Sequence, residues 1–103
     1  MARILIAEHN ATTAEYLQTA LKKAGNSVTV VDNCLDAWRK SAADSFDVMM
    51  VDIVMPGIDG FILAQRAMQE NPDIQIVFIT GFAGVAIETY AASIHGTPPI
   101  TSR

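Results

Sequence analysis

The most informative stretch of this 103-residue chain is residues 46–60, which read FDVMMVDIVMPGIDG. It begins with a strongly apolar segment, Phe46 to Val51, which is typical of a strand buried on both faces of a parallel sheet. Asp52 follows this segment directly. Proline and glycine then mark a loop, and Asp59-Gly60 favours a tight turn. We therefore predict a buried strand that delivers a carboxylate to a loop.

Short apolar runs and helical patterns alternate on both sides of this stretch. We expect further strands over residues 4–7, 28–31 and 74–79, and a helix after each of the first three strands. The expected N-caps are Thr12 or Thr13 for the first helix and Asp32 or Asn33 for the second, with Gly25 ending the first and Pro72 the third. The side chains expected to face the sheet are Ala14, Leu17, Leu21 and Ala24, then Leu35, Trp38 and Ala42, then Phe61, Ala64 and Met68.

This order of elements predicts an α/β fold, in which an open parallel sheet carries helices on both faces. Residues 1–103 are expected to form a single domain. Residues 81–93 have the pattern of a helix, but Pro98 and Pro99 then break regular structure. A fifth strand and helix would need about 20 more residues, so we expect a C-terminally truncated or rearranged fold. Its uncovered sheet edge predicts that the chain forms a homodimer or swaps segments.

The bulk composition excludes several classes of function. The net charge is −4 with no basic run, which argues against direct nucleic-acid binding. No apolar run reaches the roughly 18 residues that suggest a membrane span, and no export signal is visible. Cys34 is the only cysteine, so one chain can build neither a disulfide nor a cysteine-based zinc site. A reducing cytoplasm fits this composition best.

Polar residues follow three of the predicted strands: Glu8 and His9, Asp52, and Thr80. In open parallel sheets the carboxyl ends of the strands share one crevice, so these residues should converge. Two neighbouring carboxylates repel each other unless a cation joins them, which makes a Mg²⁺ site with Glu8, Asp52 and the backbone carbonyl of Val54 sensible. Asp52 could then attack phosphorus, and the Thr80 hydroxyl could hydrogen-bond a phosphoryl oxygen.

Three blocks of sequence, residues 4–8, 46–60 and 77–81, resemble the response-regulator receiver (CheY-like, flavodoxin-like) family. The resemblance covers residues 2–87, leaving 88–103 as an atypical tail. Residues 52–56 and 79–83 are similar to single-domain receivers of the CpdR type.

This resemblance implies a two-component phosphorelay protein. Asp52 would be the phosphoacceptor, Glu8 and Val54 metal-site residues, and Thr80 the switch hydroxyl. It further implies that a histidine kinase or phosphotransfer protein is the donor, and that a downstream protein is the target. It also implies a role in regulated proteolysis. The protein would be a phosphoacceptor signalling protein and not a classical enzyme.

The chain departs from the family pattern at three places. His9 stands where the family usually has a second acid, and magnesium prefers oxygen to imidazole nitrogen, so His9 is read first as a surface residue and only second as a metal ligand. The lysine expected after the fifth strand is missing, with only Arg103 near that place, and so is the last helix. These departures motivate an alternative: a degenerate receiver that acts as a phosphorylation-independent interaction module.

Overall fold

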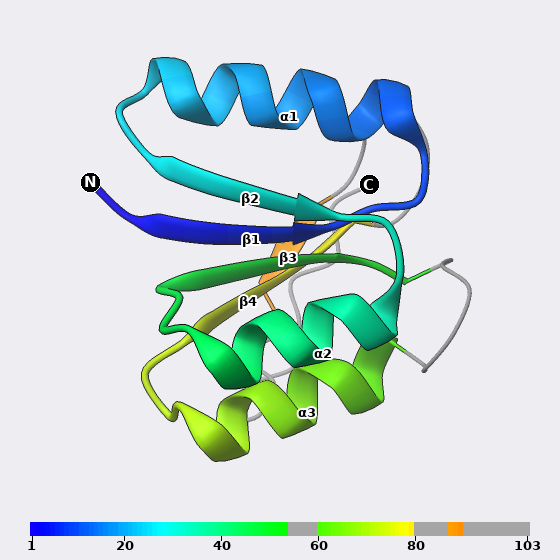
Figure 1. The fold of residues 1–103 in the computed structure, drawn as a ribbon, viewed down its shortest axis with the longest axis vertical. Coiled ribbons are helices and arrows are strands. Elements are labelled where there is room, and N and C mark those ends of the chain that lie inside the picture. The colour runs from blue at the N-terminus through cyan, green and yellow to red at the C-terminus, as the bar shows by residue number, and fades with distance from the viewer. Residues whose placement is uncertain (54–59, 80–86, 90–103) are drawn as a thin grey trace.

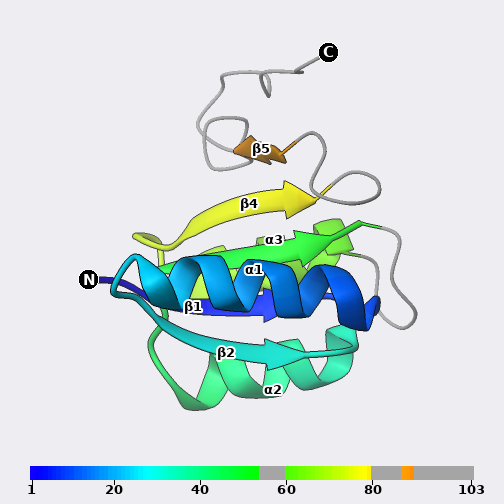
Figure 2. The ribbon, with the colours of Figure 1, turned by 90° about the horizontal axis from the view of Figure 1, so that it is seen from above.

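A computed structural model describes residues 1–53, 60–79 and 87–89 of the chain. Its strands form one five-stranded sheet with the order β2-β1-β3-β4-β5 (Figure 2). The first four strands are parallel, and β5 runs antiparallel to β4. The elements are β1 (Arg3–Ala7), α1 (Ala11–Lys23), β2 (Ser27–Val31), α2 (Cys34–Ala43), β3 (Val48–Asp52), α3 (Gly60–Glu70), β4 (Gln75–Ile79) and β5 (Ile87–Thr89).

The sheet lies between two helical layers, with α1 on one face and α2 and α3 on the other (Figure 1). Successive residues of a strand point to opposite faces. Leu5 and Met49 accordingly pack in the core beneath α2 and α3, whereas Ile6 and Met50 belong to the core beneath α1. Leu5, Ile6 and Met49 are fully buried. The predicted parallel sheet with helices on both faces is therefore confirmed.

The predicted N-cap of the first helix was wrong. Asn10 caps α1, because its side-chain oxygen accepts a hydrogen bond from the backbone N–H of Thr13 at 2.9 Å, and Thr12 and Thr13 lie inside the first turn. Asn, like Thr, is a strong N-cap, so the choice depended on where the chain leaves β1. The other end was predicted correctly: α1 ends at Lys23, and Gly25 follows with a φ of +97°, a conformation that favours glycine.

The predicted inner faces of α2 and α3 were partly wrong. In α2 the buried residues are Cys34 and Ala37, while Trp38 is half-buried and Leu35 and Ala42 are exposed. Cys34 and Ala37 are small, so α2 can approach the sheet closely through them. In α3 the buried apolar side chains are Leu63, Ala64, Ala67 and Met68.

Phe61 is 45% exposed, in contrast to its expected place in the core. Its ring lies against Phe78 of β4, with the ring centroids 4.7 Å apart. It therefore covers part of the sheet from the rim of α3. The hydrophobic periodicity identified both helices but not all of the residues on their inner faces. The spacing alone does not show which side of a helix lies closest to the sheet.

The helix predicted for residues 81–93 was wrong over residues 87–89, which form β5. Its residues pair with Val77, Phe78 and Ile79 of β4. An exposed strand edge carries unpaired backbone N–H and C=O groups, which a neighbouring strand can hydrogen-bond. This pairing can override the helical pattern of the neighbouring segment's own sequence. The β4 edge expected to be open is thus paired along these residues, while the homodimer stays a prediction. Among residues 1–53, 60–79 and 87–89, none of the helices has both the length and the hydropathy of a membrane span.

Gly60, the first residue of α3, packs tightly against the end of β3. A Cβ atom added there would lie 3.1 Å from Cγ1 of Val51 and 3.6 Å from the carbonyl oxygen of Asp52. The small residue therefore lets the start of α3 approach the strand end that carries Asp52. Asp59-Gly60 was predicted only as a tight turn, so this packing role is additional.

We predict that Gly60→Ala lowers the free energy of unfolding by at most about 1 kcal/mol, because the new methyl group crowds Cγ1 of Val51 while the higher helix propensity of alanine offsets part of the loss. Urea unfolding measures the change. In the double variant Gly60→Ala with Val51→Ala, the space left by the valine methyl groups should make the two losses less than additive. Strict additivity would show that the two residues do not crowd each other.

Candidate functional site

Two carboxyl groups meet where β1 and β3 end. The two strands are parallel neighbours with Ala7 opposite Val51, so Glu8, which follows β1, comes beside Asp52, the last residue of β3. Glu8 is only 3% exposed and Asp52 is half-buried. Their side chains lie close enough to form a hydrogen bond when one of them carries a proton. The structure thus brings together the two acids that the sequence analysis placed at the same edge of the sheet.

Backbone groups hold Glu8 in this position. Its own N–H donates to the carbonyl oxygen of Val31, at the end of β2, at 3.0 Å. The backbone N–H of Asn10 donates to Oε2 of Glu8 at 3.0 Å, and the backbone N–H of His9 also donates to this carboxyl group. Glu8 is therefore tied both to the sheet and to the segment that starts α1, which limits the directions its carboxyl group can take.

The environment raises the pKa of Glu8 from 4.5 to about 7. Burial is the largest cause, and the hydrogen bond and the negative charge of Asp52 also raise the pKa, while the backbone N–H groups of Asn10 and His9 lower it. A hydrogen bond between two carboxyl groups requires a proton on one of them. With a pKa of about 7, Glu8 carries a proton in a large fraction of molecules near neutral pH, and a cation could take the place of that proton.

These two residues fit a magnesium ion, because magnesium prefers oxygen ligands and is usually held by one or two carboxylates. Glu8 and Asp52 would hold it, together with the carbonyl of Val54, which lies outside the described residues. His9 is exposed. Within the described part of the chain, no three His, Cys, Asp or Glu side chains gather into a group that could hold a metal. The role of His9 as a ligand stays an unconfirmed prediction.

Thr80 also lies outside the described residues, but its neighbour Ile79 is placed. Ile79 is paired with Asp52 in the sheet, and its carbonyl oxygen accepts a hydrogen bond from the N–H of Ile53 at 3.3 Å. The chain therefore leaves β4 at the edge that carries Asp52. This position is compatible with the predicted role of Thr80, which stays a prediction. Arg103 is likewise outside the described residues.

Asn10 is a residue of the site that the sequence analysis missed. Its backbone N–H contacts Glu8 and its side chain caps α1. The sequence did contain a sign of this role, because Asn10 comes two residues after Glu8 and directly before a helical pattern. Thr12 and Thr13 are similarly good N-caps by residue type, so they were predicted in its place.

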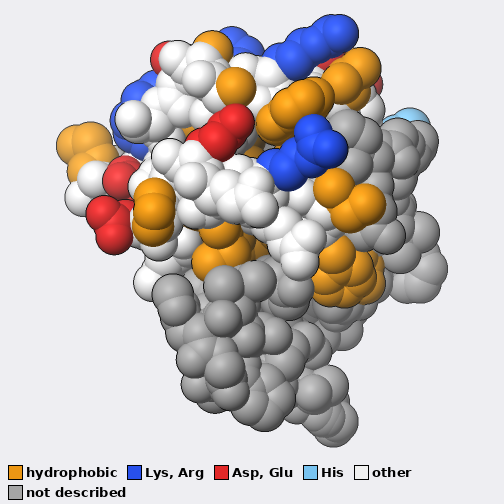
Figure 3. Space-filling view, turned by 90° about the horizontal axis from the view of Figure 1, so that it is seen from below, with side chains coloured by type: hydrophobic (Ala, Val, Ile, Leu, Met, Phe, Trp, Pro, Cys, Tyr) orange, Lys and Arg blue, Asp and Glu red, His pale blue; other side chains and the backbone are white. Residues whose placement is uncertain are grey.

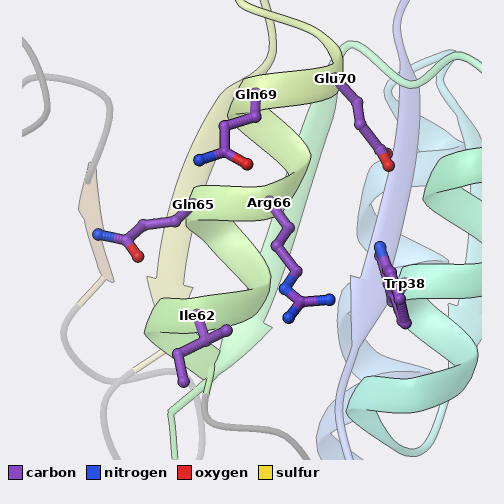
Figure 4. A pocket seen from close by; sticks show the side chains of 6 residues that line it. All are labelled: Trp38, Ile62, Gln65, Arg66, Gln69 and Glu70. Atoms are coloured by element: carbon purple, nitrogen blue, oxygen red, sulfur yellow. The ribbon is translucent and has the colours of Figure 1, made fainter.

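A hollow of about 490 Å³ lies away from this pair, between α2 and α3, and its lining includes neither acid. In it the guanidinium group of Arg66 lies over the ring of Trp38, 4.7 Å from the centroid (Figure 4). Leu35 on α2 and Phe61 and Ile62 on α3 are exposed apolar residues. Hydrophobic and charged side chains are interspersed on the face of the protein seen in Figure 3. The lining of the hollow also includes Arg66 and Glu70, but no second carboxyl group that could hold a metal ion together with Glu70, so Glu8 and Asp52 are the candidate site.

The parallel sheet between two helical layers, with two acids at its carboxyl edge, defines a CheY-like α/β domain, and similarity to known proteins identifies the family. Residues 4–97 match the response regulator receiver domain, so the chain belongs to this family. It is 46% identical over 87 residues to the response regulator receiver protein CpdR of Brucella abortus, covering 84% of this chain and 72% of that protein. It is 33% identical over 79 residues to the transcriptional regulator NtrC of Rhizobium meliloti, covering 77% of this chain but 16% of NtrC.

Solved structures agree with this assignment. The response regulator TrrA of Thermotoga maritima, in complex with Mg²⁺-BeF, superimposes with a TM-score of 0.74 at 28% identity, over 81% of this chain and 72% of TrrA. TrrA in complex with the histidine kinase ThkA gives a TM-score of 0.72 at 27% identity, over 82% of this chain and 73% of TrrA. The predicted family, the CheY-like fold and the likeness to CpdR are therefore confirmed, and the family consists of signalling proteins that are not classical enzymes.

The raised pKa of Glu8 predicts how the stability of the metal-free protein depends on pH. Between pH 4.5 and about 7 the folded protein holds a proton that the unfolded chain releases, so the contribution of Glu8 to stability falls as the pH rises. The slope of this contribution reaches at most about 1.4 kcal/mol per pH unit. In Glu8→Gln, whose amide can still donate to Asp52, this pH-dependent contribution to stability should be absent.

Urea unfolding of both proteins across this pH range measures the effect, because the difference between their unfolding free energies cancels the other titrating groups. Glu15→Gln is the matched control, since Glu15 is an exposed residue of α1 and should leave the pH dependence unchanged. Identical pH profiles for Glu8→Gln and the parent protein would contradict the raised pKa.

Proposed function

We propose that this protein is a response-regulator receiver that accepts a phosphoryl group on Asp52 from a phosphohistidine donor. The observation that carries the proposal is the strand register, which brings the buried Glu8 beside Asp52 at the carboxyl edge of the sheet. Membership of the receiver family supports it. So does the solved complex of the related regulator TrrA with a histidine kinase.

In the proposed transfer, a carboxylate oxygen of Asp52 forms a bond to phosphorus while the bond from phosphorus to the donor's imidazole nitrogen breaks. The leaving imidazole keeps the electron pair of that bond, and the product on this chain is an aspartyl phosphate. Glu8 supplies a second oxygen ligand beside the reacting group. A bound magnesium ion would supply the positive charge that offsets the negative charges of both carboxylates and of the phosphoryl oxygens.

Signal output would follow from the added charge. A phosphoryl group adds about −1.5 to −2 charges near pH 7, which can reorient nearby hydrogen-bonding groups. We propose Thr80 as the hydroxyl that responds, and a separate protein as the target. We propose regulated proteolysis as the process affected, as the resemblance to CpdR-type receivers implies. A cytoplasmic location goes with this proposal and rests on the absence of a disulfide pair, because Cys34 is the only cysteine.

We predict that the protein gains the mass of one phosphoryl group when it is incubated with Mg²⁺ and acetyl phosphate. Asp52→Asn should gain none, because an amide is a far weaker nucleophile than a carboxylate. Intact-protein mass spectrometry makes the measurement. Asp73→Asn is the control: Asp73 is exposed and precedes β4 at the opposite edge of the sheet, so this variant should be phosphorylated like the parent. Equal mass gain in the parent and Asp52→Asn would exclude Asp52 as the acceptor.

A second candidate function is a degenerate receiver that binds partners without phosphorylation. The observation that favours it is the exposed His9 in the place of a second acid, next to an acid pair with no third such side chain gathered around it in the described residues. On this reading the site would hold magnesium too weakly for phosphoryl transfer, because two carboxylates offset less of the ion's charge than three.

We predict that His9→Asp tightens Mg²⁺ binding by roughly tenfold, because it adds a negative charge close to Glu8 and Asp52. Isothermal titration calorimetry measures the affinity, and His9→Asn, which removes the imidazole without adding charge, is the matched control. Binding in His9→Asp together with no detectable binding in the parent would favour the degenerate function. Tight binding in the parent would remove the basis for it.

A further inference from the structure

Asn10 uses three of its polar groups in two different tasks. Its backbone N–H donates to Oε2 of Glu8 at 3.0 Å. Its side-chain oxygen accepts from the N–H of Thr13 at 2.9 Å, and its backbone carbonyl accepts from the N–H of Ala14 at 3.0 Å. One residue thus connects the first turn of α1 to the carboxyl group of Glu8.

The two tasks depend on the same backbone conformation. Asn10 is extended, with φ −79° and ψ 116°, as expected of an N-cap residue. The side-chain bond to Thr13 and the carbonyl bond to Ala14 hold the residue in this conformation, and its N–H then points back at Glu8. Without the side-chain bond, the first turn of α1 loses one of the few partners for its free N–H groups. The backbone N–H of residue 10 would then be less firmly oriented towards the carboxyl group of Glu8.

We propose that Asn10 is a positioning residue, which orients the Glu8 carboxyl group towards Asp52 by capping α1. This inference rests on the proposed function for its consequence, since Glu8 and Asp52 are the proposed magnesium ligands. Asn10 acts through its backbone and through Glu8 and need not touch the ion itself. Removing its side-chain oxygen should therefore weaken magnesium binding even though both acids remain in the chain.

A second asparagine supplies a matched control, because Asn33 caps α2 in the same way. Its side-chain oxygen accepts from the backbone N–H of Asp36 at 2.8 Å, and its amide nitrogen donates to the carboxyl groups of Asp32 and Asp36. These three bonds stay within residues 32–36. Replacing a capping Asn by Ala costs about 1 kcal/mol of stability. Asn10→Ala and Asn33→Ala should hence be comparably destabilised but differ at the acid pair.

The test compares Asn10→Ala, Asn10→Ser and Asn33→Ala in the full chain. Calorimetric titration with Mg²⁺ and the initial rate of phosphorylation by acetyl phosphate are the first readouts. We expect about tenfold weaker binding and slower phosphorylation for Asn10→Ala and parent-like values for Asn33→Ala. Asn10→Ser should recover most of the loss, because serine is also a strong N-cap. Equal binding by Asn10→Ala and the parent, or an equal loss in Asn33→Ala, would overturn the proposal.

Amide hydrogen exchange at position 10, measured without metal, separates this inference from the proposed function. Exchange should be faster in Asn10→Ala, near the parent rate in Asn10→Ser, and unchanged in Asn33→Ala. If the parent neither binds Mg²⁺ nor accepts phosphate, the proposed function fails, and the exchange pattern alone decides whether Asn10 holds Glu8. Unchanged exchange in Asn10→Ala would refute it. If Asn10→Ala does not fold, Asn10→Gly removes the same oxygen at a smaller cost to the helix.

Discussion

The parallel pairing of β1 with β3 is the constraint on which the rest of this structure depends. It places Ala7 opposite Val51, so that Glu8, which follows β1, and Asp52, the last residue of β3, lie side by side. Both strands lie inside the sheet and carry buried side chains on their two faces. A shift of one residue in their register would turn the side chains of one strand to the opposite faces. The core therefore specifies the register, and the register specifies the acid pair.

At the carboxyl edge of the sheet, the fold holds two carboxyl groups close together even though their negative charges repel each other. Burial of Glu8 beside Asp52 disfavours two negative charges, which is why the pKa of Glu8 rises to about 7. Backbone N–H groups from His9 and Asn10 offset part of this cost and also fix the direction of the carboxyl group. A receiver site needs such a place, where a cation is attractive and oxygen ligands are already oriented.

The errors of the sequence analysis have one cause in common. Thr12 and Thr13 were preferred to Asn10 as caps, because residue type alone does not show where the chain leaves β1. Phe61 was placed in the core because its helical spacing is right, although at 45% exposure it lies at the rim of α3. Residues 87–89 have a helical pattern, yet they pair with β4. In each case the structure that a segment adopts was determined by its contacts with other segments, which the local sequence pattern does not contain.

Local patterns were enough to identify the alternating strands and helices, the parallel sheet, and Asp52 as an acid at the end of a buried strand, because periodicity and turn residues act over a few neighbouring positions. They were also enough to propose Glu8 as its partner, since parallel strands end at a common edge. Only the tertiary structure determined that Glu8 is buried beside Asp52, that Asn10 links Glu8 to α1, and that Gly60 packs against Val51. These features depend on distances between segments far apart in the chain, which only the packed core fixes.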